Sequence, residues 1–151
     1  MSLDVTLTEI TATPHDEATR VLLKTDGRFE LVSLAEWTAR FPGTTPMTLS
    51  GGVMETASVF EYNITHNLGA MAEAAGIYQH LWRPEEINIT RARQLVEPLR
   101  EGLTRLRANP DAFRAHNPPN GWGSYSELVT FVEAYLDACE CYPEAVVTAY
   151  R

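Results

Sequence analysis

Two short polar clusters hold the side chains of this sequence that are best suited to recognise a ligand. The first cluster, residues 62–67, reads YNITHN, and the second cluster, residues 117–125, reads NPPNGWGSY. Carboxamides offer hydrogen-bond donors and acceptors without charge. The indole of Trp122 stands between two glycines, which allow a ring to approach closely and stack on it. We therefore expect the two clusters to face one another across a binding site.

The candidate ligand-binding residues share a polar or aromatic side chain and a place in one of the two clusters: Asn63, Thr65, His66, Asn67, Asn120 and Trp122. We place Arg91 or Arg93 at the edge of the site. A helix that starts near Asn63 would favour an anionic group there. The structural alternative carries equal weight: Asn120-Gly121 forms a turn, Trp122 fills the core and Ser124 caps a helix.

Other side chains give less support for chemistry. His66 or His116 is a candidate general base, because imidazole titrates near neutral pH. The four histidines and two cysteines form no metal-binding pair at helical spacing, and no phosphate-binding glycine motif follows a strand, so we expect no metal and no cofactor. The candidate nucleophiles each have an ordinary structural role, as a helix cap, a helix-surface residue, a core residue and a helix-end residue: Ser124, Ser126, Cys139 and Cys141. These residues do not decide whether the protein is an enzyme, and on balance they favour a protein without catalytic activity.

Composition limits the partners. The formal net charge is −8, and this argues against binding a nucleic-acid backbone or an anionic membrane. No apolar stretch has the length of a membrane span or a secretion signal, so we expect a cytoplasmic protein. A small molecule is the expected ligand. A terminal strand at Ala145 to Tyr150 could also pair by its edge with a second copy of the chain and form a homodimer.

The elements that position these residues predict an α+β fold. The alternation from Asp4 to Thr13 predicts a strand, followed by a polar loop at residues 14–17. Two strands at residues 20–25 and 28–32, joined by Asp26-Gly27, predict a tight hairpin. Ser33 and Glu36 form a capping box that begins a short helix, which Pro42-Gly43 ends.

Further strands are predicted at residues 46–49 and, after a turn at Gly51-Gly52, at residues 53–62. Helical spacing of apolar residues then predicts three helices: from about Asn63 to Gly76, from Thr90 or later to Ala108 with Pro98 inside, and from the capping box at Ser124 to Cys139. A final strand follows. We expect one domain over residues 1–151, with mostly strands in 1–62 and mostly helices in 63–151.

The two clusters, with Asn109-Pro110 between them and Tyr142-Pro143-Glu144-Ala145 beyond, resemble a family of small uncharacterised proteins encoded by bacteriophages and actinobacteria. The resemblance covers about residues 62–151 and rests on the motifs NxTxN and NGWG at similar separation. The N-terminal strands are not part of it. It implies no activity, but phage origin suggests proteins that hold a host nucleotide signal or block a host protein.

These observations favour a non-enzymatic protein that binds a small, nucleotide-like molecule and sequesters a host signal. One alternative is a protein-interaction module, in which NGWG is a structural lock and the acidic surface docks on a host protein. Another is an enzyme that uses His66 as its base.

Overall fold

The computed structural model describes residues 2–12, 20–46, 48–49 and 54–151 of the chain. The fold is α+β, as predicted. Residues Met1–Ile10 and Thr56–Arg151 form one compact unit, unit 1, and residues Thr11–Glu55 form a second, unit 2. The single domain predicted for residues 1–151 thus has two compact parts, each with a core of its own.

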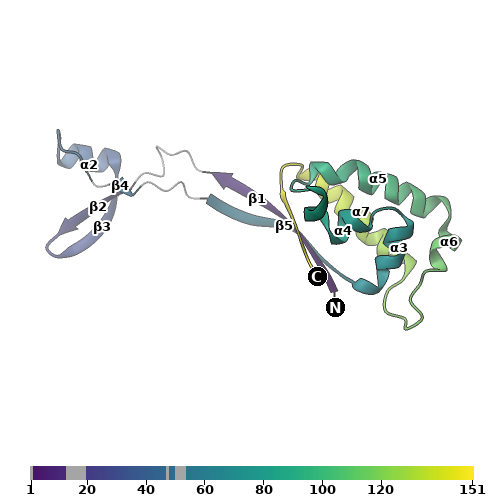
Figure 1. The fold of residues 1–151 in the computed structure, drawn as a ribbon. Helices are drawn as coiled ribbons and strands as arrows, with labels where there is room; N and C mark the ends of the chain where they lie inside the picture. Colours follow the sequence, from purple (N-terminus) through teal and green to yellow (C-terminus); the bar gives the residue numbers. More distant parts are fainter. Residues whose placement is uncertain (1, 13–19, 47, 50–53) are drawn as a thin grey trace. The chain divides into compact units, whose positions relative to one another are not determined.

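A three-stranded sheet forms one side of unit 1. Strand β1 (Ser2–Ala12) lies in the middle, between β5 (Met54–Thr65) and β6 (Val146–Tyr150). β1 and β6 are antiparallel, with Val5 opposite Ala149. Alternate residues of β1 are buried, which is the pattern expected of a strand with one face on the core. The predicted first and last strands of the chain are therefore partners in one sheet (Figure 1).

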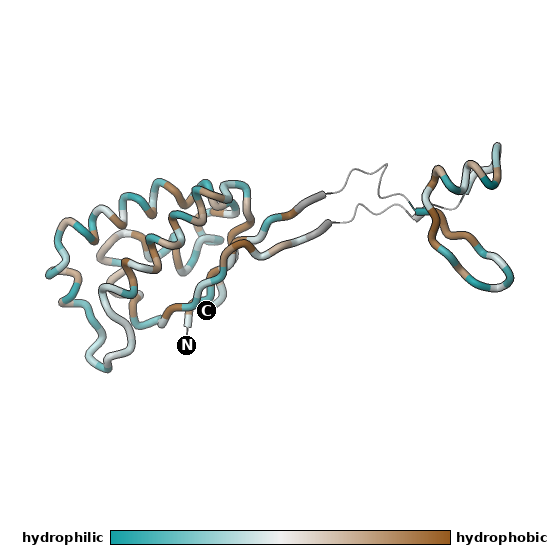
Figure 2. The backbone as a smooth tube through the Cα atoms, turned by 180° about the vertical axis from the view of Figure 1, so that it is seen from behind, coloured by the Kyte–Doolittle hydropathy of each residue, from teal (hydrophilic) through white to brown (hydrophobic). Residues whose placement is uncertain are grey.

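Helices cover the inner face of this sheet. They are η1 (His66–Leu68), α3 (Gly69–Ala74), α4 (Tyr78–Trp82), η2 (Pro84–Ile87), α5 (Arg93–Ala108), α6 (Pro110–Arg114) and α7 (Tyr125–Cys141). The two long helices, α5 and α7, pack against each other. Hydrophobic and hydrophilic stretches alternate along both (Figure 2), as expected of helices with one buried face.

Aromatic rings join the sheet to α7. The Phe60 ring stacks on Tyr135, with the centroids 5.3 Å apart and the planes 7° from parallel. The ring of Tyr62 tilts against Phe131 at 5.1 Å. These contacts fix the end of β5, and with it the first cluster, against the helix that follows the second cluster.

The start of α7 is confirmed as predicted. Ser124 has extended backbone angles and its hydroxyl accepts a hydrogen bond from the Glu127 amide. Helix α5 starts at Arg93, later than Thr90, and Pro98 still lies inside it. The Gln94 side chain supports this start, because its Oε1 accepts from the amide of Thr90 at 2.9 Å.

The predicted helix start near Asn63 is wrong. β5 continues through Thr65, whose hydroxyl caps the single turn η1, and α3 begins only at Gly69. Ile64 is buried as a strand residue, so its hydrophobicity fitted either structure. The end of the predicted helix is correct, since Gly76 follows α3 with a φ of +72°.

Unit 2 is a small sheet with one helix. Its strands are β2 (Arg20–Thr25), β3 (Arg28–Ser33) and β4 (Thr48–Leu49), in the order β3-β2-β4. The hairpin is confirmed: Asp26 and Gly27 both have positive φ, at 50° and 79°.

Ser33 caps helix α2 (Leu34–Arg40) by accepting from the Glu36 amide, as the predicted capping box requires. The buried core of unit 2 consists of Val21, Leu23 and Val32, with Trp37 packed against it. The predicted loop at residues 14–17 and the turn at Gly51-Gly52 lie outside the described residues. In the described part of the chain, no helix is long and apolar enough to cross a bilayer.

Candidate functional site

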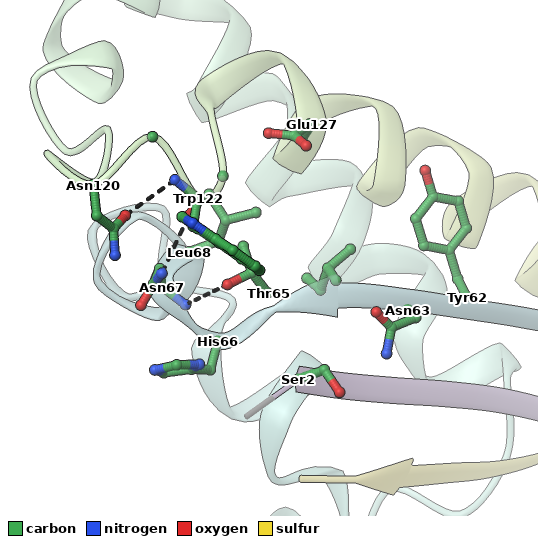
Figure 3. Close-up of a pocket in the computed structure, with 13 residues that line it drawn as sticks. Ser2, Tyr62, Asn63, Thr65, His66, Asn67, Leu68, Asn120, Trp122 and Glu127 are labelled. Carbon is green, nitrogen blue, oxygen red and sulfur yellow. Dashed lines mark hydrogen bonds between the residues drawn. The ribbon is translucent and has the colours of Figure 1, made fainter.

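The two clusters meet. The Asn67 side chain, in the turn η1 after β5, donates from Nδ2 to the main-chain oxygen of Trp122 at 3.3 Å. Asn67 and Trp122 are 55 residues apart in the sequence, so this bond joins the turn after β5 to the loop before α7. The prediction that the clusters face one another is confirmed (Figure 3).

Gly123 packs closely against the end of the first cluster. Its φ is +105°, and a Cβ atom built on it would lie 2.8 Å from Cγ2 of Thr65 and 3.0 Å from the Leu68 side chain. Only glycine fits this position without a shift of its neighbours, for both conformational and steric reasons. Gly121 differs from Gly123. Its φ is also positive, at +73°, but a Cβ atom built on it would have no heavy atom of another part of the chain within 4 Å.

Several polar side chains of the clusters hold the local backbone. Asn120 Oδ1 accepts from the Trp122 amide at 3.0 Å, which makes a side-chain turn around Gly121. Thr65 Oγ1 accepts from the Asn67 amide at 3.3 Å. Asn117 Oδ1 accepts from the Tyr125 amide at 2.7 Å, at the first turn of α7. The carboxamides therefore fix the shape of the site as well as line it.

Between the clusters lies an open pocket of about 870 Å³. The residues lining it come from the end of β5, the turn η1, the second cluster, the start of β1 and the first turn of α7: Ser2, Tyr62, Asn63, Ile64, Thr65, His66, Asn67, Leu68, Asn120, Gly121, Trp122, Gly123 and Glu127. All six residues predicted to bind a ligand are among them. Their role in binding remains a prediction.

Trp122 occupies the middle of this site. Its side chain is 72% exposed, so the alternative in which it fills the core is wrong. In Figure 3 the indole extends from its loop towards Thr65, with Asn120, Asn67 and His66 on one side and Glu127 and Asn63 on the other. An exposed ring held by a fixed backbone is a surface on which a planar ligand can stack.

The charges around the pocket are negative. Of the thirteen described residues that line it, none is lysine or arginine, and one, Glu127, is a carboxylate. Asn63 donates to a second carboxylate, Asp4, on the neighbouring strand. The predicted arginines lie elsewhere, because Arg91 donates to the main-chain oxygen of Glu144 and Arg93 pairs with its carboxylate. Their placement at the pocket edge was wrong, and so was the helix start expected to attract an anion.

Of the four candidate nucleophiles, Ser124 is engaged and Cys139 is buried, whereas Cys141 is exposed. Ser124 accepts from the Glu127 amide and donates to the Glu127 carboxylate at 2.8 Å, so its hydroxyl serves the cap. Burial raises the pKa of the Cys139 thiol to about 12, which keeps it protonated at neutral pH. His66 is exposed at the pocket. The described residues contain no group of three or more His, Cys, Asp or Glu arranged to hold a metal ion.

Sequence reasoning missed the three lining residues that lie outside both clusters, Ser2, Leu68 and Glu127. Glu127 had a signal, because a capping box puts the glutamate that follows the cap by three positions in the first turn of the helix, beside the loop that precedes it. Ser2 had none, since its position depends on how β1 is placed in the sheet. No family model matches the chain, and no match was found among curated proteins or solved structures.

Proposed function

We propose that this protein is a non-enzymatic small-molecule-binding protein whose ligand occupies the pocket between the two clusters. The observation that carries the proposal is the exposed indole of Trp122 at the centre of a hollow lined by carboxamides and hydroxyls. Pockets that bind small molecules combine apolar or aromatic surface with a few placed polar groups, and this pocket has both.

Each residue has a role in this proposal. Trp122 stacks on a ring of the ligand, a contact worth about 1–3 kcal/mol. Asn120 and Asn67 each use one part of the carboxamide to hold the loop, and the remaining donor or acceptor atoms orient the ligand. Asn63 and Thr65 line the neighbouring wall, and His66 lies at the rim.

The wider biological part of the proposal rests on the resemblance to phage and actinobacterial proteins. In that setting the protein has a phage-related origin, acts in the cytoplasm and holds a host signal molecule away from its target. A binding protein without catalysis suits such a role, because sequestration needs affinity and stoichiometry only.

Isothermal titration calorimetry against nucleosides, nucleotides and oligosaccharides tests the proposal. We expect at least one compound to bind with one site per chain. The Trp122→Ala variant should then bind it about tenfold more weakly or worse, the loss expected for one stacking contact. Trp122→Phe should keep most of the affinity. Trp37→Phe, a change in unit 2, is the matched control and should leave it unaltered. A ligand that binds Trp122→Ala as tightly as the unaltered protein would refute the site.

A second candidate is a protein-interaction module in which the NGWG loop is a structural lock. The observation that favours it is that Asn67, Asn117 and Asn120 each already bond to the loop backbone. In this case the acidic surface would dock on a host protein. A stoichiometric partner captured from host lysate would favour this candidate, provided that its binding survives Trp122→Ala and is unaffected by any compound of the panel.

A further inference from the structure

The electrostatics of the pocket restrict which small molecules it can hold. A phosphate group in a protein site is usually met by lysine, arginine or a helix N-terminus. The described lining residues include no lysine or arginine, and the carboxylates of Glu127 and Asp4 stand at or beside the pocket. A ligand group that carries negative charge would therefore meet repulsion from these carboxylates, and none of the described lining residues offers it a lysine or arginine.

Two amides of the helix N-terminus beside the pocket already have hydrogen-bond partners in the protein. At the start of α7 the Tyr125 amide donates to Asn117 and the Glu127 amide donates to Ser124. The Glu127 carboxylate itself lies in that first turn, where it interacts favourably with the helix dipole. An incoming phosphate would have to displace Asn117 and Ser124 to reach these two amides. The same holds at η1, where Thr65 accepts from the Asn67 amide.

We propose, on the basis of the function proposed above, that the pocket selects an uncharged ring with hydrogen-bond donors on its edge and discriminates against its phosphorylated forms. The ring stacks on Trp122, and an amino or hydroxyl group of the ligand donates to the Glu127 carboxylate. Nucleosides and sugars share this chemistry, the former through a base and the latter through a ring face with hydroxyls. The nucleotide-like ligand expected from the sequence is thus replaced by a molecule that resembles a nucleotide without its phosphate.

The size of the discrimination follows from the charges. When two like unit charges lie a few ångströms apart in a solvent-accessible site, their repulsion lowers a binding constant by on the order of tenfold. A nucleoside monophosphate should accordingly bind at least about tenfold more weakly than its nucleoside at low salt. The difference should shrink as salt is raised from about 0.15 M to about 1 M, because the Debye length falls from about 8 Å to about 3 Å.

The test follows the Trp122 indole N–H signal in a proton–nitrogen correlation spectrum of the full chain, assigned by its loss in Trp122→Phe. Adenosine and adenosine monophosphate are titrated in parallel, then uridine and its monophosphate, then maltose and chitobiose. Work at about pH 8 keeps imidazole groups near their neutral form. We expect an uncharged compound to shift the signal and the phosphorylated form to do so only at higher concentration. The compounds that shift the signal show whether the ligand class is nucleosides or sugars.

Two variants remove the same charge from the same helix. Glu127→Gln keeps a side chain that can complete the capping box, so the fold should be retained. Glu127→Gln should lower the ratio of the affinity for the uncharged compound to the affinity for its phosphorylated form several-fold. Asp137→Asn, ten residues along α7, is the control and should change nothing, because about 15 Å of helix separates the two positions and charges that far apart are screened.

The outcomes separate this inference from the proposed function. A monophosphate that binds more tightly than its nucleoside, in unaltered protein, would overturn the inference and leave the proposed binding site standing. An equal preference in Glu127→Gln and unaltered protein would also overturn it, because the carboxylate would then have no part in the selection. If no compound of the panel, charged or uncharged, moves the Trp122 signal, the inference and the proposed function both fail.

Discussion

Both units of the protein expose a large aromatic side chain, but the described surroundings of the two rings differ. Trp122 in unit 1 is 72% exposed, and Phe29 in unit 2 is 66% exposed. The Trp122 loop is held by Asn67 and Asn120 and packs through Gly123 against the end of β5. Phe29 lies on the strand β3, where the Lys24 amine approaches its ring at 5.4 Å.

The difference shows that exposure alone does not indicate function. A single exposed aromatic residue is common on protein surfaces and needs no explanation. Trp122 is distinguished by a fixed backbone, by polar side chains that converge on it and by an adjacent pocket. Unit 1 can support such a site because it has a large core, whereas the core of unit 2 is three buried side chains among its described residues.

The largest expected effect concerns the two cores. Leu99 is fully buried in α5, and Leu99→Ala should lower the free energy of unfolding of unit 1 by about 2–5 kcal/mol. Leu23→Ala removes the same atoms from the smaller core and should expose the amides of β2 and β3 to hydrogen exchange while α7 stays protected. Equal loss of protection in β2 and α7 upon Leu23→Ala would show that the units unfold together and would end the comparison.

The next effect separates two glycines of the site. Gly121→Ala should cost about 1–2 kcal/mol, the penalty for a Cβ atom at positive φ. Gly123→Ala carries a similar penalty and adds about 1–3 kcal/mol of overpacking against Thr65 and Leu68. Urea unfolding measures both variants. If they cost the same, the close approach of the clusters is absent in solution.

Alkaline pH should affect unit 1 more than unit 2. Burial raises the pKa of Cys139 from 9.0 to about 12 and also raises the pKa of Tyr135. The folded state therefore keeps protons that the unfolded state loses, so this stability is complete below about pH 9 and decreases as pH rises towards about 12. The slope for one such group is at most about 1.4 kcal/mol per pH unit.

No titratable side chain is buried in the described part of unit 2, so its exchange protection should change less over this range. Cys139→Ala and Tyr135→Phe should each flatten the pH dependence of unit 1. An unaltered slope in both variants would show that neither buried group causes the alkaline loss of stability.

The smallest effect is on stability at the two exposed rings. Trp122→Ala and Phe29→Ala should each change the free energy of unfolding by no more than about 0.5 kcal/mol, as expected for exposed positions. They should differ in ligand binding, which only Trp122→Ala should weaken. Thermal unfolding and calorimetry on the same samples measure both quantities. A large stability loss in Trp122→Ala would favour the structural lock over the binding site.

Local signals in the sequence predicted much of the fold. Asp26-Gly27 and Ser124 act on the backbone within a few residues, so the hairpin and the start of α7 followed directly. The helix start after Asn63 was misplaced because Ile64 and Leu68 are buried in either structure. The cap at Thr65 decides between a strand and a helix at Ile64, and the spacing of hydrophobic residues gives no information about this cap.

The candidate site was predictable in composition and less so in charge. That the clusters meet followed from their similar chemistry, but the exposure of Trp122 did not, because flanking glycines permit either a buried or an exposed ring. The arginines were misplaced because their partner is remote in sequence. Arg93 pairs with Glu144, 51 residues away, and such pairings depend on tertiary packing.

The most direct test of the central claim is a map of amide chemical shifts of the full chain on addition of the tightest-binding compound of the panel. One site built from two clusters predicts that the largest changes fall in both residues 62–68 and residues 120–127, together with the Trp122 indole N–H. Changes confined to one of these segments, or centred in unit 2, would contradict it.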